Sequence, residues 1–514
     1  MSCPFLSALN VSTIPKQMGR ILSMAKRCPV ARNMFSTSIS SEEKVVTCSD
    51  PKQCISKDCP YVEAKIDMKT LKLKKDIQQV PKNCAHHEKF VQSLKTLNES
   101  NASFDYQKHF NNLIEAKKQD STYRVFRKVL RDAGQFPYAN EYSSGEQKRV
   151  TVWCSNDYLG MSWHPQVQEA AVTAINKYGV GSGGTRNISG NTMLHEELER
   201  ELADLHNKES ALVFTSCYVA NEATLHTLGV RLPNVTLYSD AGNHASMIHG
   251  IRTSRAPKKI FRHNDPDHLR ELLKKGEREA PKVVAFETVH SMSGNICPLG
   301  EFLDVCKEFN ALSFVDEVHA VGLYGEEGAG VAQERGLMHR IDAITGTLGK
   351  AYASIGGYLA GDKALVDMIR SYASGFIFTT SLPPPVLASA LASVRLLRSA
   401  TGKELRDKHQ KRVTAVRNEL VAAGLPVIDC PSHIIPVHVG DATLCTKLSH
   451  DLLSQHQIYV QAINYPTVAK GEERLRIAPT PHHTDEHTAQ LVEALTQVWK
   501  SNDLDMNTVN VVAA

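Results

Sequence analysis

Short apolar runs alternate with amphipathic segments along the middle of the 514-residue chain. Apolar runs bounded by polar loops predict strands that are buried on both faces of a sheet. We expect five such strands, at 211–215, 235–238, 283–286, 312–315 and 343–345. Helical spacing marks the intervening segments near 192–206, 219–228 and 299–310. This alternation predicts an α/β fold with a doubly wound, largely parallel sheet.

A second, smaller unit follows three consecutive prolines at 383–385, which open a long helical stretch. The strands expected after it, near 434–439, 458–462 and 474–478, predict a small α+β domain. A chain of this length also exceeds what one hydrophobic core usually supports. We therefore expect an N-terminal segment of the core at 101–160, a large domain at 161–382, a small domain at 383–501 and a tail at 502–514.

The N-terminal region has a different composition. Its first 41 residues contain no Asp or Glu, carry five Lys or Arg and end in a Ser-rich stretch. This composition is typical of a mitochondrial transit peptide, which we place at 1–50, and it predicts a location in the mitochondrial matrix. Residues 51–100 mix Lys, Glu and Pro without periodicity, which predicts a flexible linker.

Bulk properties exclude several classes of protein. No apolar run approaches the roughly 20 residues of a membrane-spanning helix, although peripheral association with the inner membrane stays open. The net charge of +4 gives no sign of nucleic-acid binding. Twelve scattered cysteines lack zinc-type spacing and favour a reducing compartment.

Polar residues that could carry chemistry follow the ends of the expected strands. In an open α/β sheet, ligands gather beyond the carboxyl ends of parallel strands. Six side chains fall at or just past such ends: Cys217, His244, Ser291, Asp316, His319 and Lys350. We expect them to converge on one site.

Lys350 is the most informative of the six, because Gly and Thr residues frame it downstream of Asp316 and His319. This order suits pyridoxal phosphate (PLP) chemistry, in which a Lys forms a Schiff base with the cofactor. A buried carboxylate keeps the pyridine nitrogen protonated, so that the ring can withdraw electrons. The imidazole of His244 is flat enough to stack on such a ring. Cys217 lies between a strand and the helix expected from about 219, and backbone N–H groups at such a helix start bind phosphate.

Other patterns are weaker. The segment 179–184 matches GxGxxG but follows a helix, whereas dinucleotide binding requires a preceding strand. His195 does not belong to an HExxH motif, and no metal site is expected. His482 and His483 precede a helix with acidic residues in its first turn, and we expect both histidines to face solvent.

Taken in order, these motifs resemble those of the α-oxoamine synthases, PLP enzymes of fold type I that condense an amino acid with an acyl-CoA. The likeness runs from about 106 to about 499 and rests on segments 154–160, 179–190, 239–244, 315–320 and 347–350. It is strongest to members that join glycine to succinyl-CoA. Those members release 5-aminolevulinate, CoA and CO₂ in the first step of haem biosynthesis.

The resemblance implies roles for individual residues. Lys350 would bind the cofactor and transfer protons, Asp316 would pair with the pyridinium, and His244 would stack on the ring. The further cofactor contacts implied are Ser291, His319, Cys217, Tyr218 and Thr347. Thr379 and Thr380 would complete the phosphate site from the partner subunit of a homodimer.

The resemblance also implies substrate contacts. Asn156 and Arg476 would hold the glycine carboxylate. Arg124, Ser239, Lys258 and Thr467 would contact the acyl-CoA, with Arg124 and Thr467 suited to the succinyl carboxylate.

Three Cys-Pro pairs precede the folded part, at Cys3, Cys28 and Cys59. A thiolate can ligate haem, and the pairs resemble the haem-regulatory motifs of this family. Two further pairs, at Cys297 and Cys430, fall in the folded region and are interpreted as structural.

Three alternatives stay open at this point. One is 2-amino-3-ketobutyrate CoA ligase, which also uses glycine but transfers an acetyl group. The others are a non-catalytic partner subunit of the same fold and a haem sensor with a vestigial core. Retention of Lys350 argues against the last two.

Overall fold

The computed structural model describes residues 104–506 except 121 and 133, together with three short strands. These are β1 (Val45–Val46), β2 (Ala64–Asp67) and β3 (Lys72–Leu73), which pair antiparallel in the order β1-β2-β3. The remainder of the predicted transit peptide and linker, with Cys3, Cys28 and Cys59, lies outside the described residues. The chain divides into two compact units, Met1–Glu115 and Ala116–Ala514. The helix α5 (Tyr106–Gln119) has no buried residue.

A seven-stranded sheet forms the centre of the second unit, with the order β7-β13-β12-β11-β10-β8-β9. All its strands run in one direction except β13. Their bounds are β7 (Ser210–Phe214), β8 (Thr236–Asp240), β9 (Lys258–Phe261), β10 (Lys282–Glu287), β11 (Leu312–Asp316), β12 (Ala343–Thr347) and β13 (Gly357–Gly361). The predicted α/β class and largely parallel sheet are therefore confirmed.

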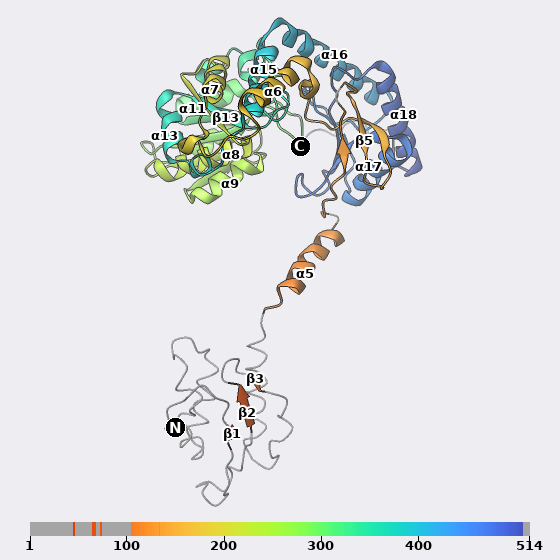
Figure 1. Cartoon of the computed structure of the whole chain (residues 1–514), viewed down its shortest axis with the longest axis horizontal. Coiled ribbons are helices and arrows are strands. Elements are labelled where there is room, and N and C mark those ends of the chain that lie inside the picture. The colour runs from red at the N-terminus through yellow and green to blue at the C-terminus, as the bar shows by residue number, and fades with distance from the viewer. Residues whose placement is uncertain are drawn as a thin grey trace, which may run out of the picture. The chain divides into compact units, whose positions relative to one another are not determined.

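Helices cover both faces of this sheet, because successive residues of each strand face opposite sides. In β7, Leu212 and Phe214 belong to one hydrophobic core, whereas Ala211 and Val213 belong to the other. The first core includes residues of α8 (Cys217–Arg231), α9 (Ala245–Ser254), α13 (Lys363–Tyr372) and α14 (Ser374–Ile377). The second includes residues of α7 (Met193–Leu205), α10 (Pro266–Lys274), α11 (Leu299–Glu308), α12 (Val331–Glu334) and α15 (Pro384–Arg398). Figure 1 shows α8, α9, α11 and α13 grouped around β13.

A further core lies in the C-terminal part of the chain. It packs α16 (Ala400–Ala422), α17 (Ala442–His456) and α18 (Asp485–Ser501) against a three-stranded antiparallel sheet. The strands of that sheet are β14 (Ile435–His438), β17 (Arg474–Ile477) and β16 (Gln461–Ile463). A four-stranded sheet contains β15 (Ile458–Tyr459), β6 (Lys148–Val152), β5 (Tyr138–Glu141) and β4 (Val129–Leu130). The single strand expected at 458–462 is therefore divided between two sheets. Figure 1 shows α17 and α18 beside β5.

The domain limits expected from the sequence stay a prediction. Helix α15 opens the expected small domain, yet Leu387 and Val394 on this helix pack in the core of the large sheet. It also packs against α6 (Pro165–Tyr178) and α7. None of the helices that the structure describes has both the length and the apolar character needed to cross a membrane.

The expectation that His482 and His483 face solvent is wrong. The His483 side chain is buried, with its ring 3.7 Å from that of Trp153 and its Nδ1 2.9 Å from Thr480 Oγ1. His482 is partly buried and its Nε2 lies 3.2 Å from the carbonyl oxygen of Leu159. The acidic first turn marks where α18 begins, but it does not determine which way the residues before the helix point.

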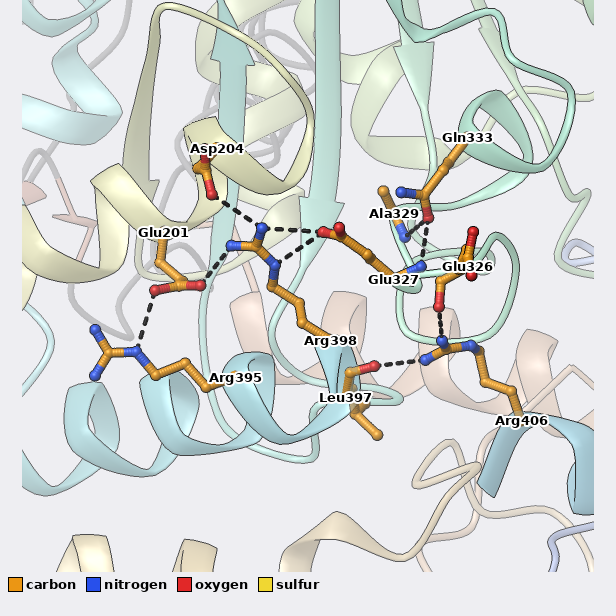
Figure 2. A network of polar contacts seen from close by, with 10 residues as sticks. All are labelled: Glu201, Asp204, Glu326, Glu327, Ala329, Gln333, Arg395, Leu397, Arg398 and Arg406. Carbon is orange, nitrogen blue, oxygen red and sulfur yellow. Dashed lines mark hydrogen bonds and ion pairs between the residues drawn. The ribbon is translucent and has the colours of Figure 1, made fainter. Parts of the chain in front are cut away.

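Arginines on α15 and α16 contact neighbouring helices and the loop that follows β11 (Figure 2). Arg398 donates to Glu201 and Asp204 on α7 and to Glu327 in the loop that follows β11. Arg406 donates to the carbonyl oxygens of Leu397 and Glu326. Together these contacts fix the loop after β11, which leaves the sheet directly beside Asp316.

Candidate active site

The carboxyl ends of five strands bring the expected site residues to one edge of the sheet. Glu287 at the end of β10 lies opposite Asp316 at the end of β11, and Asp316 lies opposite Thr345 of β12. Past these ends come the remaining five residues of the expected set: Cys217 after β7, His244 after β8, Ser291 after β10, His319 after β11 and Lys350 after β12. The structure therefore places the six at the same edge.

Lys350 lies in a short loop that the backbone fixes in place. The amide of Leu348 donates to the carbonyl oxygen of Gly356, and that of Ser354 donates to the carbonyl oxygen of Leu348. Lys350 Nζ lies 3.0 Å from His319 Nε2. Burial lowers the pKa of Lys350 to about 8, so far more of its amine is uncharged near neutral pH than for an ordinary lysine. An uncharged amine is the nucleophile that attacks an aldehyde.

The Asp316 carboxylate is buried and receives two hydrogen bonds. Its Oδ1 accepts from the backbone amide of Val318 at 2.8 Å and its Oδ2 from Asn221 Nδ2 at 2.6 Å. Burial raises the pKa of Asp316, while these two donors act in the opposite direction. Sequence reasoning missed Asn221, because a single polar residue in a helix that contains several others gives no distinctive signal.

His244 occupies the N-cap position of α9, with an exposed side chain. Its Nδ1 lies 2.8 Å from Ser246 Oγ, which fixes the plane of the ring. Part of the His244 ring is exposed, but the residues around it partly desolvate the ring. This desolvation lowers the pKa of His244, so the imidazole is uncharged at neutral pH. An uncharged ring held in a fixed plane is suited to stacking on a flat ligand.

The first turn of α8 provides an anion-binding position. Cys217 and Tyr218 are its first two residues, and the N-cap Ser216 accepts from the amide of Val219. The first N–H groups of a helix have no partner within the helix and attract phosphate. A Cβ on Gly357 would lie 2.2 Å from the backbone nitrogen of Cys217. Only glycine lets β13 pass this close to the helix start.

The expected phosphate-binding threonines lie on two segments. Thr347 Oγ1 accepts from the amide of Gly349 and donates to the carbonyl oxygen of Gly356. Thr379 Oγ1 donates to the carbonyl oxygen of Gly375, and the exposed Thr380 forms a backbone bridge with Thr185.

Arg476 and Asn156, the residues expected to hold a carboxylate, lie close together. Arg476 Nη1 is 3.4 Å from Asn156 Oδ1, and its Nε donates to the carbonyl oxygen of Ser291 at 3.0 Å. Arg476 Nη2 donates to Tyr158 Oη at 3.0 Å, and the same oxygen lies 3.0 Å from His319 Nδ1. Tyr158 is fully buried and joins Arg476 to the Lys350–His319 pair. Tyr158 belongs to the segment 154–160 on which the resemblance rests, but the sequence alone gave it no role.

The expected acyl-CoA residues form two groups. Arg124 Nη2 lies 3.4 Å from Thr467 Oγ1. Ser239 is buried on β8, where its Oγ accepts from Asn243 Nδ2 at 2.9 Å, and Lys258 is exposed at the start of β9. Among the described residues, no hydrogen bond joins the second group to the first.

This arrangement fits PLP, judged from the side chains themselves. It offers an amine with a lowered pKa, a buried carboxylate, an imidazole with an accessible ring and the N-terminus of a 15-residue helix. Buried Glu287 Oε1 has no hydrogen-bond partner in the described part of the chain, as expected beside a site that a polar ligand completes. Within the same part, no group of three or more His, Cys, Asp or Glu side chains could hold a metal ion.

Comparison with known proteins shows the family of the chain. Residues 148–495 match the family of aminotransferases class I and II. The chain is 48% identical over 536 residues to the erythroid-specific mitochondrial 5-aminolevulinate synthase of Opsanus tau, covering 98% of this chain and 92% of the relative. It is 58% identical over 415 residues to the human erythroid-specific enzyme, covering 80% and 71%. The relatives are named as mitochondrial proteins, which supports the predicted mitochondrial location.

A solved structure of SPT with its PLP internal aldimine has a similar fold, with a TM-score of 0.72 and 28% identity. The match covers 78% of this chain and all of that one. The expectations of fold type I, of PLP as cofactor and of an acyltransferase are thereby confirmed, and a non-catalytic subunit or a haem sensor is not supported. The chain belongs to the 5-aminolevulinate synthases, PLP-dependent acyltransferases within the class I and II aminotransferase family.

Proposed function

We propose that this site condenses glycine with succinyl-CoA and releases 5-aminolevulinate, CoA and CO₂. The observation that carries the proposal is the continuous set of contacts from Lys350 through His319 and Tyr158 to Arg476. It joins a reactive amine to a carboxylate-binding group across one small site. Bound PLP supplies an electron sink for the negative charge that develops on the glycine α-carbon.

The residues of the chain have distinct tasks in this reaction. Arg476 and Asn156 hold the glycine carboxylate, because a guanidinium and an amide offer matching donors. Lys350 takes the α-proton of glycine and later returns a proton, and its pKa of about 8 suits transfer in both directions. Asp316 keeps the ring nitrogen of the cofactor protonated and His244 holds the face of the ring.

The residues that the resemblance assigns to the acyl-CoA bind the acyl donor in this proposal. Arg124 and Thr467 bind the free carboxylate of the succinyl group, because the pair offers a charged and a neutral donor side by side. Lys258 and Ser239 contact the CoA portion. The exposed amine of Lys258 suits a phosphate group of CoA.

The active enzyme is a homodimer in this proposal. Thr379 and Thr380 bind the cofactor phosphate of the opposite subunit, together with Cys217, Tyr218 and Thr347 of the first. Five apolar side chains support burial against a second copy, because each exposes more than half of its surface: Val180, Ile188, Met193, Ile355 and Phe378. Weakened dimerisation after substituting Phe378 by Ser would test this.

The location and control of the enzyme are further parts of the proposal. The N-terminal composition supports import into the mitochondrial matrix. Cys3, Cys28 and Cys59 are proposed to bind haem, the end product of the pathway, as thiolate ligands. Haem titration of the full chain and of a variant with all three cysteines changed to Ala would test this, since identical absorbance changes would remove the idea.

Product formation from glycine with either succinyl-CoA or acetyl-CoA tests the central assignment. The proposal requires 5-aminolevulinate from succinyl-CoA at a kcat/KM well above that for acetyl-CoA. A preference for acetyl-CoA would instead identify a 2-amino-3-ketobutyrate CoA ligase.

A further inference from the structure

Asn221 on α8 contacts two parts of the site at once. It lies four residues after Cys217, one turn along the same face of the helix. Its side chain is almost fully buried, and its Nδ2 donates both to Asp316 Oδ2 at 2.6 Å and to Ser246 Oγ at 3.1 Å. Both hydrogens of the amide are thus used within the site.

Ser246 extends this connection to the cofactor-stacking histidine. It is fully buried in the first turn of α9, and its Oγ lies 2.8 Å from His244 Nδ1. A single line of hydrogen bonds therefore runs from Asp316 through Asn221 and Ser246 to His244. It joins Asp316, which would pair with the ring nitrogen of PLP, to His244, which would stack on the ring.

The electrostatic surroundings of Asp316 explain why such a donor is needed. Burial disfavours its charged form, and the buried carboxyl of Glu287 on the neighbouring strand adds repulsion. The Glu317 carboxyl and the Cys217 thiol also lie near enough to interact with it. The positive charge of Lys350 acts in the opposite direction. An amide nitrogen can only donate, so its contact favours the ionised carboxylate.

We propose that Asn221 is a positioning residue for the cofactor ring: it holds the Asp316 carboxylate ionised and aimed at the pyridine nitrogen, and through Ser246 it sets the plane of His244. The inference rests on the proposed role of Asp316. Without Asn221 the ring nitrogen loses its charged partner, while a cofactor that lacks this nitrogen loses nothing.

The test compares PLP with its 1-deaza analogue, in which carbon replaces the ring nitrogen. The affinity of each for the full-length apoenzyme is measured by absorbance and protein fluorescence. Asn221→Leu, which has nearly the same volume but no donor, should weaken PLP binding about 10-fold or more, the usual effect of losing a charge-assisted hydrogen bond. The affinity for the deaza analogue should change less than about 2-fold. Ser246→Ala should weaken both ligands, because it affects the ring face.

Two controls separate this role from packing. Thr224→Val changes another fully buried polar residue one turn further along α8 and should leave both affinities unchanged. Asp316→Asn should itself abolish the preference for PLP, and in that background Asn221→Leu should have no additional effect on the preference. If Asp316→Asn keeps the preference, the proposed role of Asp316 fails. If Asp316→Asn removes it and Asn221→Leu does not, only the inference about Asn221 fails.

A second variant covers the case in which Asn221→Leu does not fold. Asn221→Ser keeps a polar group that is too short to reach both Asp316 and Ser246, and it should show the same selective loss of PLP. An equal loss of both ligands in Asn221→Ser, with thermal stability like that of Thr224→Val, would overturn the inference.

Discussion

Arg124 Nη2 lies 3.4 Å from Thr467 Oγ1, although 343 positions separate the two residues in the chain. Arg124 follows α5, whereas Thr467 belongs to the loop between β16 and β17. The guanidinium is exposed, so it can exchange the threonine hydroxyl for a ligand carboxylate at little cost. The pair is thus a candidate for selecting the acyl group.

Replacing Arg124 by Ala should therefore reduce selectivity between thioesters. We expect kcat/KM for succinyl-CoA to fall roughly 5-fold, which corresponds to about 1 kcal/mol for an exposed charged contact. The value for butyryl-CoA, which lacks the free carboxylate, should stay the same. Arg127→Ala, three residues away, is the matched control. Equal losses for both thioesters would show that Arg124 does not recognise the carboxylate.

The buried guanidinium of Arg476 should have a larger effect, because it is held in a fixed plane by Ser291 and Tyr158. Arg476→Lys should raise the KM for glycine roughly 10- to 100-fold, since it replaces a planar donor pair by a point charge. The KM for succinyl-CoA should change little. Arg474→Lys alters an arginine of the same strand that pairs with Glu472 instead and should leave both constants near those of the native enzyme.

Part of this architecture could be predicted because apolar runs and loop residues give direct signals. The strand at 283–286 is continuous in apolar side chains, so both its position and its burial follow from the sequence. Strand β9 could not be found in this way, because three of its four residues are exposed. Strand β13 begins and ends with glycine, which the sequence pattern treats as a loop.

The same distinction applies to the site. Lys350 and Asp316 are recognisable because a reactive amine and a carboxylate at strand ends suggest one chemistry. Asn221 and Tyr158 are not, because their importance depends on which side chains of other segments they meet. The buried position of His483 likewise depends on its contact with the distant Trp153. Contacts of this kind exist only once the sheets are assembled.

Covalent capture of PLP by the apoenzyme should become faster as the pH rises through about 8. The sign follows from the lowered pKa of Lys350, because only the uncharged amine attacks the aldehyde and its fraction increases above that pH. Borohydride reduction at timed intervals measures the capture. A midpoint near the ordinary lysine value of 10.5 would contradict the proposed burial effect. Lys350→Ala should show no capture at any pH.

Glu317 should make a pH-dependent contribution to stability. Burial raises its pKa to about 7 in the folded protein, from an ordinary value of 4.5. Between these values the native state binds more protons than the unfolded state, so the contribution of this group falls as the pH rises. Glu317→Gln cannot titrate, so the stability difference between native and variant protein should change across this window and be constant above it.

Urea unfolding at several pH values measures that difference. Gln at position 317 also keeps only one acceptor oxygen for the donors Thr288, Val331 and Ala332, so the variant should be less stable by about 1–3 kcal/mol at the acidic end of this window, and this deficit should shrink as the pH rises. Glu334→Gln on the exposed side of α12 is the control. A stability difference for Glu317→Gln that is independent of pH would contradict the assignment.

The adjacent ends of β10 and β11 bring the carboxyl groups of Glu287, Asp316 and Glu317 into one buried region, and the pKa of each is raised. Such crowding disfavours the folded apoprotein as these groups ionise, whereas a bound cationic ring offsets it. Coenzyme binding should then make the folded chain more resistant to proteolysis. The supply of vitamin B6 would thereby influence how much of this protein accumulates, in addition to how fast each molecule works.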